Sequence, residues 1–239
     1  MDSPAYLWVF GVSGAVSIAC AVTWLVFKSL GEPVDLNSNP TRRFATIVSV
    51  VFSWLALVML LGASGIFQGT LHRYVPYIAF AITLPLAVGC WFLLGTRHGV
   101  QIVRNLPIEW AIGIQTYRSL GSIFLLLSGL SLLPSEFAIP AGFGDTITGV
   151  LAIPVAAYYF SGLPARKMVA VIWNLFGIAD LVVAIAIGFL TSPSPLQLLA
   201  RDHPNLLISQ FPLVLIPAFA VPILFLLHIA TLKKLIAHP

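Results

Sequence analysis

Seven long apolar runs, separated by short polar loops, dominate this chain. Each run is about as long as the ~20 residues that an α-helix needs to cross a ~30 Å hydrocarbon layer. The pattern predicts an all-α integral membrane protein, a single domain over residues 1–239 built as a bundle of seven transmembrane helices. The predicted spans are Tyr6–Phe27, Phe44–Phe67, Val75–Leu94, Trp110–Leu133, Gly142–Phe160, Met168–Thr191 and Leu206–Leu232.

The Lys and Arg residues fall mainly on alternate loops between the predicted spans. With the N-terminus placed outside, only Arg73 and Arg201 lie on the outer side. The positive-inside rule therefore predicts an outside N-terminus and an inside C-terminus, in a bacterial-type inner membrane or a plasma membrane. The basic residues on the inner side are Lys28, Arg42, Arg43, Arg97, Arg104, Arg166, Lys167, Lys233 and Lys234.

Composition supports a membrane protein and limits its partners. With 59% hydrophobic and 8% charged residues, the chain departs from globular averages of roughly 45–50% and 25%. We expect the lipid bilayer to be the main partner, with further membrane proteins as an alternative, and no soluble catalytic or DNA-binding module. The net charge of +4 fits basic inner loops facing anionic headgroups, so no nucleic-acid partner is expected. Cys20 and Cys90 lie at membrane depth and are predicted to be free thiols.

Arg118 is the most unusual residue, because it lies well inside the fourth predicted span. An arginine near mid-membrane costs roughly 2.5–3.5 kcal/mol on insertion scales. In an α-helix, Gln115, Arg118 and Ser122 share one face at the spacing i, i+3, i+7, so we expect this polar face to point into the bundle. The planar guanidinium favours an anion or carboxylate site. A structural ion pair, or a side chain that reaches back toward water, is the alternative.

Asp180, near the middle of the sixth predicted span, is the expected counterion of Arg118. At 1.5 Å per residue their depths differ by about 6 Å, which an arginine side chain can bridge. Asn174 enters the membrane at about the depth of Gln115 and Arg118 and is expected to join the same polar lining. A carboxylate at this depth is either half of a salt bridge or a protonatable group on a transport path.

Asp145 and His228 each allow two interpretations. Asp145 follows Gly-Phe-Gly and precedes Thr146, which is the pattern of a helix N-cap. If the helix instead starts at Gly142, Asp145 turns inward toward the bundle. His228 lies near the inner end of the seventh predicted span, and we expect an interfacial or hydrogen-bonded residue there rather than a ligand.

These residues favour binding or translocation of a small, anionic molecule through a polar cavity inside the membrane. Prolines within the predicted spans, such as Pro154 and Pro217, are consistent with a cavity, because kinked helices free backbone carbonyls that need partners. The expected ligand-binding residues are Arg118, Asp180, Gln115, Ser122, Asn174 and Asp145.

Two other classes of function stay open. One is a non-catalytic accessory subunit of a larger membrane complex, in which the charged pair is structural. The other is an intramembrane lipid-modifying enzyme that uses Asp145, Asp180 or His228 as an acid–base group. The sequence contains no motif that identifies a cofactor or a metal site, so the cofactor is unknown and a non-enzymatic role is the expectation.

Overall fold

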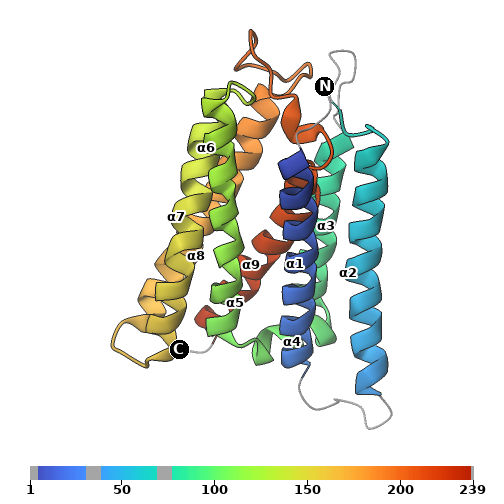
Figure 1. The fold of residues 1–239 in the computed structure, drawn as a ribbon. Helices are drawn as coiled ribbons and strands as arrows, with labels where there is room; N and C mark the ends of the chain where they lie inside the picture. The colour runs from blue at the N-terminus through green and yellow to red at the C-terminus, as the bar shows by residue number, and fades with distance from the viewer. Residues whose placement is uncertain (1–4, 31–38, 69–76, 238–239) are drawn as a thin grey trace.

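The computed structural model describes residues 5–30, 39–68 and 77–237, and all regular secondary structure in these ranges is helical. Six helices are long and apolar enough to cross a membrane, and they lie side by side in one bundle (Figure 1). This confirms the prediction of an all-α, multi-pass membrane protein. The six are α1 (Ala5–Ser29), α2 (Pro40–Ala63), α3 (Tyr77–Gly95), α7 (Ser135–Phe160), α8 (Arg166–Thr191) and α9 (Val221–Ala237), the last extended backward by η3 (Ile216–Ala220).

The fourth predicted span is occupied by three short helices laid end to end (Figure 1). They are α5 (Ile108–Ile114), the 3₁₀ helix η1 (Gln115–Gly121) and α6 (Ser122–Gly129). A 3₁₀ helix has three residues per turn and seldom exceeds three or four residues, so seven residues of it in the middle of a span are unusual. This tighter winding decides which side chains of the segment face the protein interior.

A short helix that the apolar pattern did not predict, α4 (Arg97–Asn105), follows α3 directly. Thr96 caps it by accepting a hydrogen bond from the Gly99 amide at 3.0 Å, as N-cap threonines do. Its apolar face is buried, and Gly99 packs so closely against the Phe92 carbonyl that a side chain would not fit. The segment is too short and too polar to register as a membrane span, and it lies across one end of the bundle (Figure 1).

The start of α7 differs from the prediction. The helix begins at Ser135 rather than Gly142, so Asp145 lies inside it and the N-cap interpretation is wrong. Two prolines, Pro134 and Pro140, lie just before the predicted start at Gly142. Pro134 immediately precedes the helix, however, and Pro140 withdraws only a hydrogen bond to the carbonyl of Glu136, which is exposed near the helix end. Prolines near a helix start are tolerated for this reason.

The helices pack as two groups with α9 between them (Figure 1). On one side α7 packs closely against α8 and against the α5–η1–α6 segment, and on the other side α1 packs against α2. The α9 helix contacts both α8 and α3. In the apolar stretch of Ile216–Ala237, 61% of the residues are buried, against 11% in the corresponding stretches of α2 and of α3. The outer faces of α2 and α3 are therefore left for lipid or for another protein.

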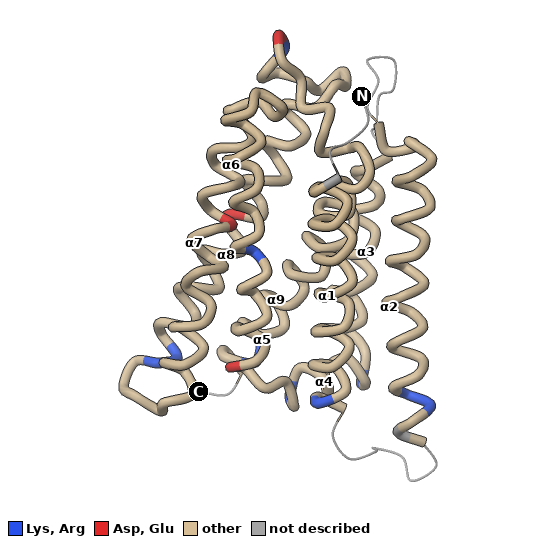
Figure 2. Tube along the Cα trace, in the orientation of Figure 1, with Lys and Arg blue, Asp and Glu red and all other residues tan. Residues whose placement is uncertain are grey.

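The Lys and Arg residues gather at the end of the bundle where α4 lies, and one blue segment stands alone at mid-height (Figure 2). Arg166 and Lys167 begin α8 at this end, and Lys28 ends α1 there. Of the two basic residues predicted on the opposite side, Arg201 lies in the loop after α8. Arg73 is outside the described residues. In the described part of the chain, the basic residues thus lie mainly at one end of the bundle, as the loop pattern predicts.

Candidate functional site

Arg118 is buried because of the 3₁₀ geometry of η1. In such a helix residues spaced by three share a face, and the buried residues of η1 are Gln115, Arg118 and Gly121. Ser122, which we placed on the same face by assuming an α-helix, is exposed at the start of α6. The structure therefore keeps Gln115 and Arg118 of the predicted stripe in the interior and leaves Ser122 outside the site.

The guanidinium of Arg118 lies between two carboxylates. Its Nε donates to Asp145 Oδ1 at 2.7 Å, and its Nη2 forms an ion pair with Asp180 Oδ2. The Arg118 side chain is 1% exposed, and those of Asp145 and Asp180 are 11% and 8% exposed. The Arg118–Asp180 pair is the one predicted from depth, and it is confirmed. Asp145 as a second partner was not predicted, because it follows from the earlier start of α7.

The remaining guanidinium nitrogen, Nη1, reaches α8 and α9. It donates to the Gly177 carbonyl at 3.0 Å and lies 3.1 Å from His228 Nε2. Arginine can only donate, so Nε2 must be the acceptor. His228 Nδ1, 2.9 Å from Asn174 Oδ1, then carries the proton and donates it to that oxygen. These contacts fix His228 as a neutral ring with a defined tautomer.

Asn174 and Trp173 hold the His228 ring in place. The Asn174 amide donates to the Ala170 carbonyl of its own helix at 2.8 Å, which leaves its oxygen aimed at the histidine. The Trp173 and His228 ring centroids are 5.1 Å apart, and the indole nitrogen donates to the Thr148 carbonyl at 3.3 Å. His228 is completely buried. Of the two expectations for this residue, the hydrogen-bonded one is confirmed and the interfacial one is wrong.

Glycines allow the helices to approach closely enough for these contacts. A Cβ built on Gly149 would collide with the backbone of Ser119, and one on Gly144 would collide with the Asp180 carboxylate. A Cβ on Gly177 would lie 2.5 Å from His228 Nε2 and 3.0 Å from Arg118 Nη1. Small residues at helix contacts of this kind are typical of membrane proteins.

Two buried polar atoms beside the network have no hydrogen-bond partner among the described residues. Gln115 donates from its amide nitrogen to the Leu224 carbonyl at 2.9 Å, but its Oε1 is unpaired. The Thr148 hydroxyl is unpaired as well. Buried polar groups are normally satisfied by protein or by water, so these atoms mark positions where water molecules are expected.

The network contains more acidic groups than basic ones. One guanidinium faces two carboxyl groups, Asp145 and Asp180, and the geometry makes His228 neutral. With both carboxyls ionised, the site carries one uncompensated negative charge, which is costly in a low-dielectric interior. The site therefore has a place for one proton or one small cation. The described residues include no group of three His, Cys, Asp or Glu side chains arranged to hold a metal ion.

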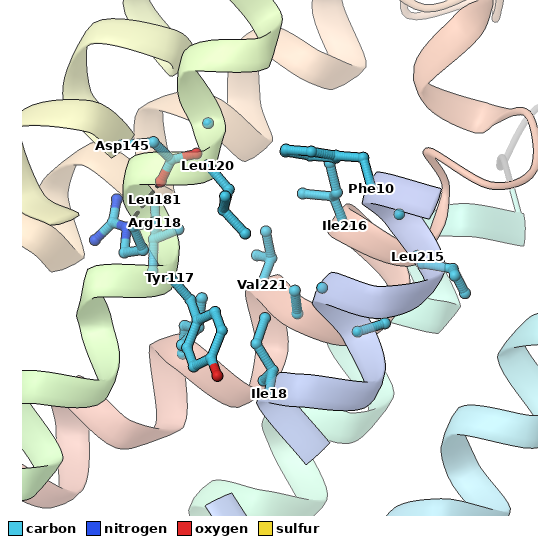
Figure 3. A pocket seen from close by; sticks show the side chains of 16 residues that line it. Phe10, Ile18, Tyr117, Arg118, Leu120, Asp145, Leu181, Leu215, Ile216 and Val221 are labelled. Carbon is cyan, nitrogen blue, oxygen red and sulfur yellow. Dashed lines mark hydrogen bonds and ion pairs between the residues drawn. The ribbon is translucent and has the colours of Figure 1, made fainter. Parts of the chain in front are cut away.

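Two small cavities, of about 50 Å³ and 60 Å³, adjoin the site. Both are lined by Asp145, Leu181, Ile216 and Val221. The first lies between α1 and η1, with Asp145 and Arg118 on one side and Phe10 and Ile18 of α1 on the other (Figure 3). One water needs about 10–15 Å³ by this measure, so each cavity has room for a few water molecules.

Most of the predicted site residues meet in one place, although they come from separate spans. Gln115, Arg118, Asp145, Asn174 and Asp180 all lie in or beside the network. Sequence reasoning missed His228. No local signal placed it in the network, because its partners Arg118 and Asn174 belong to η1 and α8.

The helices and the buried charge network define the class of this molecule, a multi-pass helical membrane protein with ionisable groups inside the bundle. The family model described as "Domain of unknown function (DUF8737)" matches residues 75–236, and the chain belongs to this family. The match begins just before α3 and includes the whole network, whereas α1 and α2 lie outside it.

One curated relative is a much longer protein. The chain is 31% identical over 91 residues to the DNA translocase FtsK of Pseudomonas syringae pv. syringae (strain B728a). The matched residues are 38% of this chain and 10% of that protein, so the chain spans about a tenth of the length of the relative. No solved structure matches the chain.

Proposed function

We propose that this protein binds and translocates a small polar species across the membrane through the network of Arg118, Asp145, Asp180 and His228. The observation that carries the proposal is the unequal charge: one guanidinium is shared by two carboxyls beside a neutral histidine. Ionisable groups inside membrane spans are expensive and usually mark pathways for ions, protons or substrates. Space for water on two sides of Asp145 supports the same function.

The geometry favours a proton or a small cation over the anion that the arginine alone indicates. Arg118 is 1% exposed and already donates to two carboxylates, a backbone carbonyl and His228. An added anion would meet a site whose charge is zero or negative. The cavities are also far smaller than the roughly 300–1,000 Å³ of pockets for larger ligands. A proton or a monovalent ion fits both the charge and the space.

We further propose seven crossings, with α5–η1–α6 as the fourth, an outside N-terminus and an inside C-terminus. The gathering of Lys and Arg residues at the α4 end supports this orientation (Figure 2) through the positive-inside rule. Single cysteines at Ser161 and Gln197, in a background without Cys20 and Cys90, test it with a membrane-impermeant maleimide. Gln197 should react in intact cells and Ser161 only after lysis. The reverse pattern, or labelling of both from one side, contradicts the topology.

Transport is tested with purified protein in liposomes that enclose a pH-sensitive dye. An imposed potassium gradient with valinomycin should drive proton uptake by the native protein. Asp180→Asn should lose it, because the remaining charges of Arg118 and Asp145 form a neutral pair. Ser122→Ala, on the same span but exposed, is the matched control and should transport normally. Absence of flux for protons, Na⁺ and K⁺ with the native protein refutes the proposal.

A second function, an accessory subunit of a larger membrane complex, is favoured by a different observation. Only 11% of the residues in the apolar stretches of α2 and α3 are buried, and the outer faces of these helices are apolar. Purification in lipid nanodiscs without detergent exchange distinguishes the two functions. A partner recovered in fixed stoichiometry, together with liposomes that conduct nothing, supports the subunit. A chain recovered alone that conducts protons supports transport.

A further inference from the structure

We infer that Asp145 is the carboxyl that takes up and releases a proton in this network, and that Asp180 is the permanent counterion of Arg118. The inference rests on the proposed function and names the residue that performs its central step. Asp145 lines both cavities, whereas Asp180 lines neither of them. The two carboxyls therefore differ in their position relative to the cavities, although both contact the same guanidinium.

The cavities approach Asp145 from different parts of the bundle. The first is bounded by Gly11, Gly14 and Tyr117, between α1 and η1. The second is bounded by Ile78 of α3 and Ser192 after α8, and by other residues toward the end of the bundle opposite α4. Asp145 thus lies where the two cavities meet the network, and Figure 3 shows its carboxylate at the edge of the first.

The wall between the two cavities is an irregular part of the chain. Ile216 and Val221 line both; Ile216 begins η3, a single π-helical turn at the start of the last span, and Val221 directly follows it. Pro217 within this turn lines the second cavity. Turns of this kind occur often at functional sites, because they interrupt the regular hydrogen-bond ladder and realign side chains.

The groups that face Asp145 set its role. Arg118 of η1 donates to it, Asp180 of α8 shares that arginine, and His228 of α9 is held by the arginine as a neutral acceptor. Arg118 and Tyr117 are the ionisable side chains that line the first cavity with Asp145, and Asp145 alone of the described ionisable residues lines the second. A proton that arrives through water from either side therefore meets the Asp145 carboxylate.

The exchange step is balanced without any other reactant. A hydronium ion in one cavity gives its proton to a carboxylate oxygen of Asp145, so one O–H bond breaks in the hydronium ion and one forms on the carboxyl. The charge of the network rises from minus one to zero. Release to a water molecule in the other cavity reverses the step. Arg118 and Asp180 stay paired throughout, so the arginine is never left without a counterion.

Infrared difference spectroscopy of the protein in lipid, recorded between high and low pH, tests the assignment. Asparagine variants do not separate the two carboxyls, because loss of either one balances the charge. Glutamate variants do, since the carbonyl stretching band of a protonated carboxyl moves when that side chain is lengthened. The band that grows at low pH should shift in Asp145→Glu and keep its position in Asp180→Glu. A shift in Asp180→Glu alone overturns the inference.

A cavity-filling variant keeps the test decisive where Asp145→Glu does not fold. A Cβ on Gly14 would contact only the Leu120 side chain, at 3.8 Å, so Gly14→Val should fold while it fills the first cavity. Proton uptake should fall without loss of thermal stability. Gly113→Val, where a Cβ would meet nothing within 4 Å, is the matched control and should leave uptake unchanged. Normal uptake in a stable Gly14→Val protein contradicts a route through this cavity to Asp145.

The two proposals fail separately. A band that shifts in Asp145→Glu, in a protein that moves no protons across liposomes, refutes translocation and keeps Asp145 as the protonated carboxyl. Proton flux with a band that follows Asp180 keeps translocation and refutes the assignment. A spectrum that does not change with pH but changes with Na⁺ shows that a cation balances the charge, and this also overturns the inference.

Discussion

The site region and the α2–α3 flank of this bundle are both built from apolar helices but are held together differently. In the site region, η1, α7, α8 and α9 are joined by ion pairs, hydrogen bonds and glycine contacts that involve main-chain atoms. In the flank, only 11% of the residues in the apolar stretches of α2 and α3 are buried. Trp54 of α2 packs on Phe219, with the ring centroids 4.9 Å apart. Lipid is as apolar as leucine, so hydrophobicity alone gives membrane helices little reason to associate. Specific polar contacts therefore define one region, and ring packing secures the other.

The largest effect should come from Arg118→Met. The substitution leaves two carboxyls without their cation in a buried site, and breaking a buried pair costs roughly 3–5 kcal/mol, less whatever protonation recovers. Thermal unfolding in lipid measures the loss of stability. Combining it with Asp180→Asn should cost less than the sum of the single losses, because the two residues contact each other. Strictly additive losses would show that the site region is not held by this pair.

A smaller effect is expected where η1 and α7 touch. Gly149→Ala places a methyl group against the backbone of Ser119, which cannot yield as a side chain would. Overpacking of this kind costs about 1–3 kcal/mol. Gly113→Ala is the control, because a Cβ there meets nothing within 4 Å, and it should be neutral or stabilising by up to about 1 kcal/mol through helix propensity. Equal melting temperatures for the two variants would argue against close packing here.

The flank should tolerate truncation. Leu60 of α2 is 71% exposed, so Leu60→Ala should change stability by no more than about 0.5 kcal/mol. Leu127 of α6 is completely buried, and Leu127→Ala should cost about 2–5 kcal/mol. The measurement is again thermal unfolding in lipid. A large loss for Leu60→Ala would show that another protein, rather than lipid, covers this face of α2.

The cysteines should give the smallest effect. Both are free in the structure, with Cys20 exposed on α1 and Cys90 partly buried on α3. Replacing both with alanine should change the free energy of unfolding by no more than about 0.5 kcal/mol. Alkylation of the native chain under denaturing, non-reducing conditions should modify both thiols, as mass spectrometry can show. A bridge between them would require α1 and α3 to meet in a way that the structure does not show.

The sequence predicts the positions of the spans well, because the length and apolarity of a membrane helix are properties of contiguous residues. Six of the seven predicted runs overlap helices long enough to cross a membrane. The last of these begins at Ile216 rather than at the predicted Leu206, because the chain between Leu206 and Leu215 forms turns and a short 3₁₀ helix. The Arg118–Asp180 pair also follows from the sequence, since depth in a membrane can be counted along each helix from its boundary. Both successes depend on distances measured along one element at a time.

The details that the sequence did not predict depend on winding and on neighbours. Ser122 is outside the site because η1 turns every three residues, and no local signal distinguishes this winding from an α-helix. Asp145 entered the site because α7 continues back through Pro140. His228 was predicted to be interfacial or hydrogen-bonded, and the sequence could not name its partners, Arg118 and Asn174, because they lie on other helices.

The order in which the network is synthesised has a consequence for the assembly of the protein. Arg118 precedes Asp145 by 27 residues, Asp180 by 62 and His228 by 110. The arginine is therefore synthesised before any of these partners. The next helix, α7, supplies its first counterion, and only the last helix completes its contacts. Correct insertion of the middle of the chain is thus secured by residues near its end, and a chain truncated after α7 would retain a half-built site at the centre of the bilayer.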